Sequence, residues 1–298
     1  MQVDQVARFT LHNGSVYALS QGSDASSFLS AGSEGLVVEW NINDASNAVA
    51  LARVNSQVFA LLNIPEKKLL VIGTMAGGIH VIDLVLKSEI HYITYHQQSI
   101  FDIKLYNDQV LVASKDGTLT VWSAVDFSLQ RILTISNLSL RMIDLNPLKN
   151  EIAIASSDNK VYIVDLSQWK VKAILQGPSN SVFSVSFIPA LNKLLAGSRD
   201  AQLYEYDLNN LQLEKQIKAH LYTINHLQLI SNDQLIATAS RDKTIRIWDS
   251  HSLELLKSLD HLKCGGHTKS VNRLLWLPEQ NVLVSASDDR TVIAWRIH

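Results

Sequence analysis

The sequence places a hydroxyl, an imidazole and a carboxylate at a fixed spacing near its C-terminal end. Ser285, His267 and Asp289 have the types of a nucleophilic triad, in which a histidine takes the hydroxyl proton and a carboxylate orients the ring. The same set recurs at two other places, His220 with Thr238 and Asp242, and His12 with Ser30 and Glu34. A tryptophan follows each hydroxyl by ten residues: Trp295, Trp248 and Trp40. A pattern repeated three times favours a scaffold, so no catalytic residue is predicted.

A second group with suitable chemistry is His261, Cys264 and His267, each three residues apart. These side chains are of the types that bind zinc. His267 already belongs to the first set, however, and no fourth ligand is evident. We therefore predict neither a metal nor a cofactor, and interpret the segment as a flexible loop with an incidental thiol.

These groups belong to a repeat that runs along the whole chain. Its clearest copy, residues 235–249, reads as two short strands joined by a turn at Asp242. The Trp248 position recurs at spacings of 42, 40, 42, 42, 42 and 47 residues, as Trp40, Ile82, Trp122, Val164, Tyr206, Trp248 and Trp295. The turn position stays in phase six residues earlier: Glu34, Ala76, Asp116, Asp158, Asp200, Asp242 and Asp289. The hydroxyl position stays in phase ten residues earlier: Ser30, Ile72, Val112, Ile154, Ala196, Thr238 and Ser285.

With Trp248-Asp249 and Gly266-His267 as its literal dipeptides, this pattern resembles the WD40 repeat family over essentially all 298 residues. A period of about 40–45 residues with four strands per unit implies a β-propeller. Seven copies imply an all-β fold of seven four-stranded antiparallel blades, in a single domain over residues 1–298.

The resemblance also implies a role for the recurring polar residues. In the family the Trp N–H donates to the hydroxyl, the hydroxyl bonds the His, and the His bonds the turn carboxylate. Three copies carry the full set: His12, Ser30, Glu34 and Trp40; His220, Thr238, Asp242 and Trp248; His267, Ser285, Asp289 and Trp295. The longer side chain of Glu34 leaves the last link of its copy in question.

Four copies depart from this pattern. Copies two, four and five lose the Trp, the hydroxyl and the His together, which predicts that apolar packing replaces the polar network. Copy three keeps His96, Asp116 and Trp122 but has Val112 at the hydroxyl position. We expect a rearranged hydrogen bond or a water molecule there.

The two ends of the chain complement each other. Residues 2–10 read as a strand before the first repeat, and the sequence stops three residues past Trp295, after the third strand of the last copy. We expect the N-terminal strand to pair into the last blade and to close the ring, which removes an open sheet edge.

Composition limits the function classes. Lys plus Arg total 26 and Asp plus Glu total 28, so no basic excess favours nucleic-acid binding. One cysteine, no signal-like N-terminus and no apolar run of about 18 residues predict a cytoplasmic protein that does not span a membrane.

Strand alternation and the family resemblance together predict the binding surface. One residue per blade, next to the apolar start of the innermost strand, should point away from the blade core. In the family this position lines the channel mouth on the top face, and here it is occupied by Tyr17, Phe59, Phe101, Arg141, Phe183, Asn225 and Asn272. The residue before the turn carboxylate adds a basic rim of Lys115, Arg199 and Arg241.

The resemblance therefore implies a non-enzymatic scaffold that binds a protein or peptide partner at the top face, with aromatic and arginine anchors of the kind found in binding hot spots. Alternatives are a hydrolase-like propeller enzyme or a small-ligand binder that uses the central channel, and a structural subunit that assembles through its outer faces. An enzyme would need carboxylates or histidines at the mouth, where Asp288 is the only carboxylate we can place.

Overall fold

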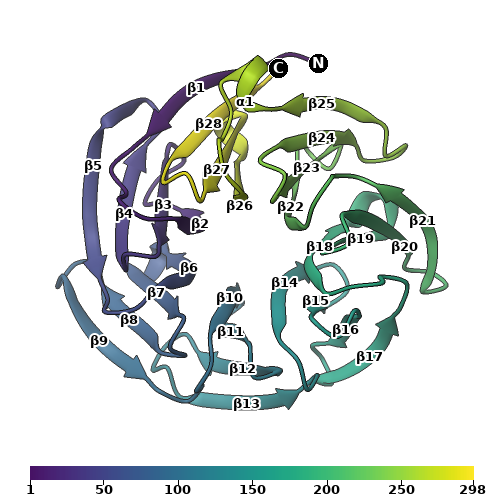
Figure 1. Ribbon diagram of the computed structural model, residues 1–298. Coiled ribbons are helices and arrows are strands. Elements are labelled where there is room, and N and C mark those ends of the chain that lie inside the picture. Colours follow the sequence, from purple (N-terminus) through teal and green to yellow (C-terminus); the bar gives the residue numbers. More distant parts are fainter.

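The computed structural model describes residues 1–298 as a ring of seven sheets around a central channel (Figure 1). Each sheet has four antiparallel strands. The innermost strands are β2 (Val16–Gln21), β6 (Val58–Ile64), β10 (Ile100–Tyr106), β14 (Leu140–Asn146), β18 (Val182–Ile188), β22 (Ile224–Ile230) and β26 (Val271–Leu277). The second strands are β3 (Ser27–Gly32), β7 (Leu69–Thr74), β11 (Gln109–Ser114), β15 (Glu151–Ser156), β19 (Lys193–Ser198), β23 (Leu235–Ser240) and β27 (Val282–Ser287).

The outer half of each blade is built the same way. The third strands are β4 (Leu36–Asn41), β8 (Ile79–Asp83), β12 (Thr118–Ser123), β16 (Val161–Asp165), β20 (Gln202–Asp207), β24 (Ile245–Asp249) and β28 (Val292–Ile297). The outermost strands are β5 (Asp44–Arg53), β9 (Ser88–Ile93), β13 (Leu129–Thr134), β17 (Lys170–Leu175), β21 (Gln212–Lys218), β25 (Leu255–Leu259) and β1 (Val3–Phe9). The predicted seven blades and four strands per blade are confirmed, and we number the blades one to seven from β2 to β26.

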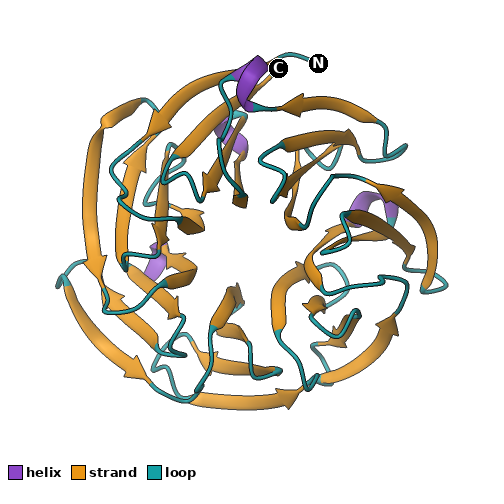
Figure 2. Ribbon diagram, viewed as in Figure 1, coloured by secondary structure: helices purple, strands orange, loops and turns teal.

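Helix is confined to four single turns (Figure 2). Three are 3-10 turns that follow innermost strands: η1 (Pro65–Lys67), η2 (Pro189–Leu191) and η3 (Pro278–Gln280). The fourth is α1 (His261–Cys264), in the lengthened connection before blade seven, where Asp260 accepts the Lys263 N–H as an N-cap. This connection, which the sequence suggested to be a flexible loop, contains a capped helical turn of four residues. No helix is long and apolar enough to cross a membrane.

The N-terminal strand closes the ring, as predicted. β1 pairs antiparallel with β28 to complete the sheet of blade seven, in the order β1-β28-β27-β26. Both ends of the chain meet at this blade (Figure 1). Because β1 supplies the outer strand that β26 to β28 lack, no blade is left with three strands.

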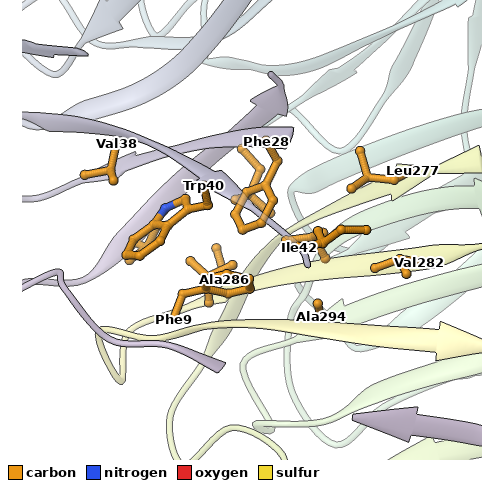
Figure 3. Close-up of a cluster of buried hydrophobic side chains, with 13 residues drawn as sticks. Phe9, Phe28, Val38, Trp40, Ile42, Leu277, Val282, Ala286 and Ala294 are labelled. Atoms are coloured by element: carbon orange, nitrogen blue, oxygen red, sulfur yellow. The ribbon is translucent and has the colours of Figure 1, made fainter. Parts of the chain in front are cut away.

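The hydrophobic core lies between the blades as well as within them. One cluster of 13 buried residues combines Leu277, Val282 and Ala294 of blade seven with Phe28 and Trp40 of blade one (Figure 3). Phe9, at the end of β1, lies 5.0 Å from the Phe28 ring and 5.1 Å from the Trp40 ring. The closing strand therefore also packs against the next blade.

All seven innermost strands share one irregularity. The register with the second strand shifts after the first residue, so the second residue has no partner and forms a β-bulge; in β2 the shift falls between Val16 and Ala18. The bulged residues are Tyr17, Phe59, Phe101, Arg141, Phe183, Asn225 and Asn272. A bulge redirects a side chain and changes the phase of alternation after it. The bulges therefore fall at the seven positions that alternation had selected.

Candidate functional site

The seven bulged residues form one ring, which we call the mouth ring. They line a single cavity of about 180 Å³ together with Arg273, and each is half-buried. Each blade contributes one side chain because every innermost strand begins at the same level. The cavity therefore lies at one end of the channel, which we call the top.

One arc of the mouth ring is a continuous row of aromatic rings and a cation. Tyr17 lies 5.1 Å from Phe59, and Phe59 lies 5.6 Å from Phe101, between ring centroids. The Arg141 guanidinium then lies between two rings, 4.5 Å from Phe101 and 4.6 Å from Phe183. Such cation–π contacts hold the guanidinium in place and strengthen when they are partly desolvated. Burial and the nearby Arg199 lower the pKa of Arg141 from its usual value.

The other arc carries two amides that join adjacent blades. Asn225 of blade six donates to the Val271 carbonyl of blade seven at 2.8 Å, and Asn272 of blade seven donates to the Val16 carbonyl of blade one at 2.9 Å. Asn272 also donates to Asp288 at 2.8 Å. These side chains are largely used in holding the ring together, so the aromatic arc is the freer surface.

The basic rim lies at the same end of the molecule. The Arg199 N–H donates to the Ser181 carbonyl at 2.9 Å, and the Arg241 N–H donates to the Thr223 carbonyl at 3.0 Å. Lys115 bonds Ser99 in the same way at 2.8 Å. Each acceptor immediately precedes an innermost strand, so each rim residue stands beside the start of that strand. All three rim side chains are exposed.

The recurring polar residues meet in the blades. In blade six, Trp248 Nε1 donates to Thr238 Oγ1 at 3.0 Å, and His220 lies 2.7 Å from that hydroxyl and 2.9 Å from Asp242. Blade seven repeats this arrangement with Trp295, Ser285, His267 and Asp289 at 2.9, 2.9 and 3.0 Å. Because a carboxylate only accepts, each His carries its proton on Nδ1, and Nε2 accepts from the hydroxyl.

In blade one, Glu34 closes the relay at 2.6 Å from His12 Nδ1, so the longer side chain still reaches the ring. Ser30 lies 2.7 Å from both His12 Nε2 and Trp40 Nε1. Burial lowers the pKa of His12, although Glu34 opposes this, and the ring stays neutral near pH 7.

Comparison with known proteins agrees with this geometry. The sequence model of the WD domain, G-beta repeat (WD40), matches residues 169–207, 211–249 and 256–296. These three stretches are WD40 repeats. Each matched WD40 stretch begins at the outer strand of one blade and ends with the third strand of the next.

A solved structure shares the propeller fold over the whole chain. The crystal structure of the WD40 β-propeller domain of Doa1 aligns with all of this chain and 97% of that chain, at a TM-score of 0.87 and 18% identity. At this identity the likeness establishes the fold alone. No curated protein matches the sequence significantly.

Blade three of the propeller has the predicted rearrangement. Thr120 supplies the missing hydroxyl: it lies 2.9 Å from both Trp122 Nε1 and His96 Nε2. Thr120 is the cross-strand partner of Val112. The hydroxyl therefore comes from the third strand instead of the second and reaches the same place.

Blades four and five differ from the prediction of purely apolar packing. Tyr162 donates to the turn residue Asp158 at 2.6 Å, and Tyr204 donates to Asp200 at 2.8 Å. Burial, with the adjacent carboxylate, raises the pKa of each phenol to about 12, so both remain donors. A tyrosine two residues before the Trp position was the available signal. Blade two does pack Val54, Ile72 and Ile82 into one buried cluster.

The His261, Cys264 and His267 side chains do not meet around a common point. His261 Nδ1 lies 3.0 Å from the Gly266 carbonyl, and both nitrogens of His267 are bonded within the relay. No group of three or more His, Cys, Asp or Glu residues has metal-binding geometry. The Ser285 hydroxyl is likewise not free to act as a nucleophile, because it is bonded to both Trp295 Nε1 and His267 Nε2.

Sequence reasoning missed a charged layer below the mouth ring. Asp102 of blade three and Arg273 of blade seven form an ion pair at 2.6 Å across the channel. Asp102 is 1% exposed and also accepts the Ile143 N–H at 2.9 Å. Asp102 and Arg273 each follow a bulged residue directly. Simple strand alternation predicts that their side chains point into the blade core. The bulge shifts the alternation, so the side chains point into the channel instead.

Proposed function

We propose that this propeller is a non-enzymatic scaffold that binds a peptide or loop of a partner protein at the mouth ring. The observation that carries the proposal is the sandwich of Arg141 between Phe101 and Phe183, continued by Phe59 and Tyr17. Aromatic and arginine side chains that are already held in position lose little conformational freedom on binding, and such residues dominate binding energy at interfaces.

The charges indicate what the partner carries. Arg141 lies within the aromatic arc and the basic rim stands beside blades three, five and six, while Asp288 is already bonded to Asn272. We infer an acidic side chain next to an apolar or aromatic one, the acid over the arginines and the apolar group on Phe59. A net charge of −2 for the whole chain supports a protein partner over nucleic acid or a membrane surface, and a cytoplasmic location stays our expectation.

Reversal of the basic rim tests this proposal. We expect a Lys115→Glu, Arg199→Glu, Arg241→Glu variant to lose a partner that wild type retains in affinity capture from the source cell with mass spectrometry. A peptide from that partner should bind the variant at least about 30-fold more weakly, which corresponds to the ~2 kcal/mol of a hot spot.

The control carries the same charge change elsewhere. Lys87→Glu, Lys170→Glu and Lys218→Glu alter three exposed lysines at outer strands or the turn before one. Both triple variants should melt like wild type. Equal retention of the partner by both variants would move the interface away from the top face, to the outer faces that a structural subunit would use.

The second candidate, a small-ligand binder, has one observation in its favour. The channel contains charged and imidazole groups below the mouth that the scaffold function does not use. Ser186 also lines this cavity, but its hydroxyl bonds the Phe187 carbonyl and not His226, which makes binding a better account of these groups than hydrolysis.

A further inference from the structure

Below the Asp102–Arg273 pair, the channel widens into a second cavity of about 240 Å³, which we call the lower chamber. Arg273 borders both this chamber and the mouth cavity, so the ion pair separates the two. One water molecule needs only about 15 Å³ on the same measure. The lower chamber is therefore large enough for a small organic molecule.

His226 is the unusual group in the lower chamber. Its side chain is 3% exposed, and neither ring nitrogen has a hydrogen-bond partner in the protein. Burial of an imidazole without partners costs about 1–3 kcal/mol of folding free energy for each unsatisfied group. Burial, with Arg273 and Lys104 nearby, holds the pKa of His226 well below its usual range. A neutral His226 presents one donor and one acceptor to the chamber.

The lower chamber is lined by two cations, Lys104 and Arg273, and two carboxylates, Asp144 and Asp233. Lys104 makes no hydrogen bond or ion pair, and Arg273 uses a single N–H on Asp102. Both oxygens of Asp102 are occupied, by Arg273 and by the Ile143 N–H. Asp144 accepts the Phe187 N–H at 2.7 Å. With Asp144 protonated, the two cations face one carboxylate, so the unpaired Lys104 and the free N–H groups of Arg273 favour an anion.

The walls of the lower chamber indicate that the anion is organic. Half of the lining residues are hydrophobic, among them Met142, Leu19 and Leu275. Apolar walls with a few convergent polar groups are typical of small-molecule sites. We propose that the lower chamber binds a small carboxylate with a short apolar part, whose oxygens accept from Lys104, Arg273 and His226. This site is independent of the mouth ring.

Asp144 gives this site a pH dependence. The charged groups that act on it are Lys104 and Asp102, and Arg273, His226 and Asp233 lie on the same lining. Burial raises the pKa of Asp144 to about 6, although Lys104 opposes the shift. A bound anion repels the ionised carboxylate, so binding takes up a proton and the affinity rises as the pH falls from 7.5 towards 5.5.

Histidine side-chain NMR tests the proposal on the full chain. We would titrate protein labelled with ¹⁵N-histidine with sodium acetate, butyrate, benzoate and succinate, against sodium chloride at equal ionic strength. The His226→Gln variant identifies the His226 resonances. We expect at least one acid to shift them saturably with a single site, and chloride to leave them unchanged.

Matched variants locate the anion. Lys104→Met should weaken binding at least tenfold, whereas Lys170→Met, on the outer strand β17, should leave it unchanged. Asp144→Asn should bind more tightly at pH 7.5 and lose the pH dependence. All variants are first checked for the wild-type melting temperature.

Several results would overturn the proposal. The first is that the His226 resonances respond to none of the four acids. The second is an equal response to chloride, and the third is an unchanged affinity in Lys104→Met. Binding that Arg199→Glu abolishes and Lys104→Met spares would place the anion at the mouth ring, which also overturns the lower-chamber site but leaves the scaffold proposal intact.

Discussion

At the residue scale, the relay of blade three shows how one hydrogen-bond network can be built from two sequences. The Trp122 N–H and the His96 Nε2 acceptor both point to one position between two strands. A hydroxyl group from either strand can occupy this position. Here Thr120 on β12 fills it and Val112 on β11 does not. The two positions are direct cross-strand partners, so their side chains approach the same place.

A pair of variants tests this equivalence. Thr120→Val leaves the Trp122 N–H and His96 Nε2 without a partner, and we expect it to lower the free energy of unfolding by about 2–4 kcal/mol in urea denaturation. Adding Val112→Thr should restore most of the loss by returning the hydroxyl to the second strand. Val112→Thr alone should cost less than Thr120→Val. No recovery in the double variant would contradict the proposed equivalence.

The residue-scale pattern also separates what a sequence can predict from what it cannot. Residue types and spacing sufficed for the polar groups of blades one, six and seven, because each link uses a fixed pair of positions. The Tyr162–Asp158 hydrogen bond was missed because Tyr162 is not at one of the recurring polar positions. It lies two residues before the Trp position, and its long side chain still reaches the turn carboxylate. Asp102 and Arg273 were missed because the bulge changes strand phase, and a bulge has no signature in one sequence.

At the element scale, β1 has two functions in the ring. Its backbone pairs with β28, and Phe9 at its end packs on Phe28 and Trp40 of the first blade. The strand was predictable because residues 2–10 read as a strand before the first repeat and the last copy lacks its outer strand. Its packing on blade one depends on ring closure in three dimensions, which the repeat pattern does not encode.

Deletion of residues 1–10 tests the closure. We expect an open ring that exposes β28 as an edge strand and aggregates, which size-exclusion chromatography and light scattering would detect. Phe9→Ala keeps the strand pairing but should destabilise the protein by about 3–5 kcal/mol, as expected for a fully buried ring. A deletion variant that remains monomeric and melts like wild type would rule out this role for β1.

At the scale of the whole molecule, the Asp102–Arg273 pair links blades that lie far apart around the ring. Neighbouring blades adhere through shared hydrophobic clusters, whereas this ion pair joins blade three to blade seven directly. It also divides the channel into the mouth cavity and the lower chamber. The fold was predictable at this scale, but the two compartments were not.

A double-mutant cycle measures the interaction energy of the Asp102–Arg273 pair. Asp102→Leu leaves a partly buried guanidinium and the Ile143 N–H unpaired, and we expect a loss of about 3–5 kcal/mol in unfolding free energy. Asp102→Leu combined with Arg273→Met removes both charges, so its loss should be smaller than the sum of the two single losses by about 1–3 kcal/mol. Strict additivity would mean that the two side chains do not act as a pair.

The position of β1 has a consequence for the folding of the nascent chain on the ribosome. Phe9 is synthesised 283 residues before Val292, its partner in the sheet. At about 5–20 residues per second, the strand waits roughly 15–60 s before its partner exists. Charged Asp4 and Arg8 within the strand make it a poor template for premature pairing during that interval. β1 is thus synthesised long before the strand it pairs with, and a nascent chain released before β28 is made could not close the ring.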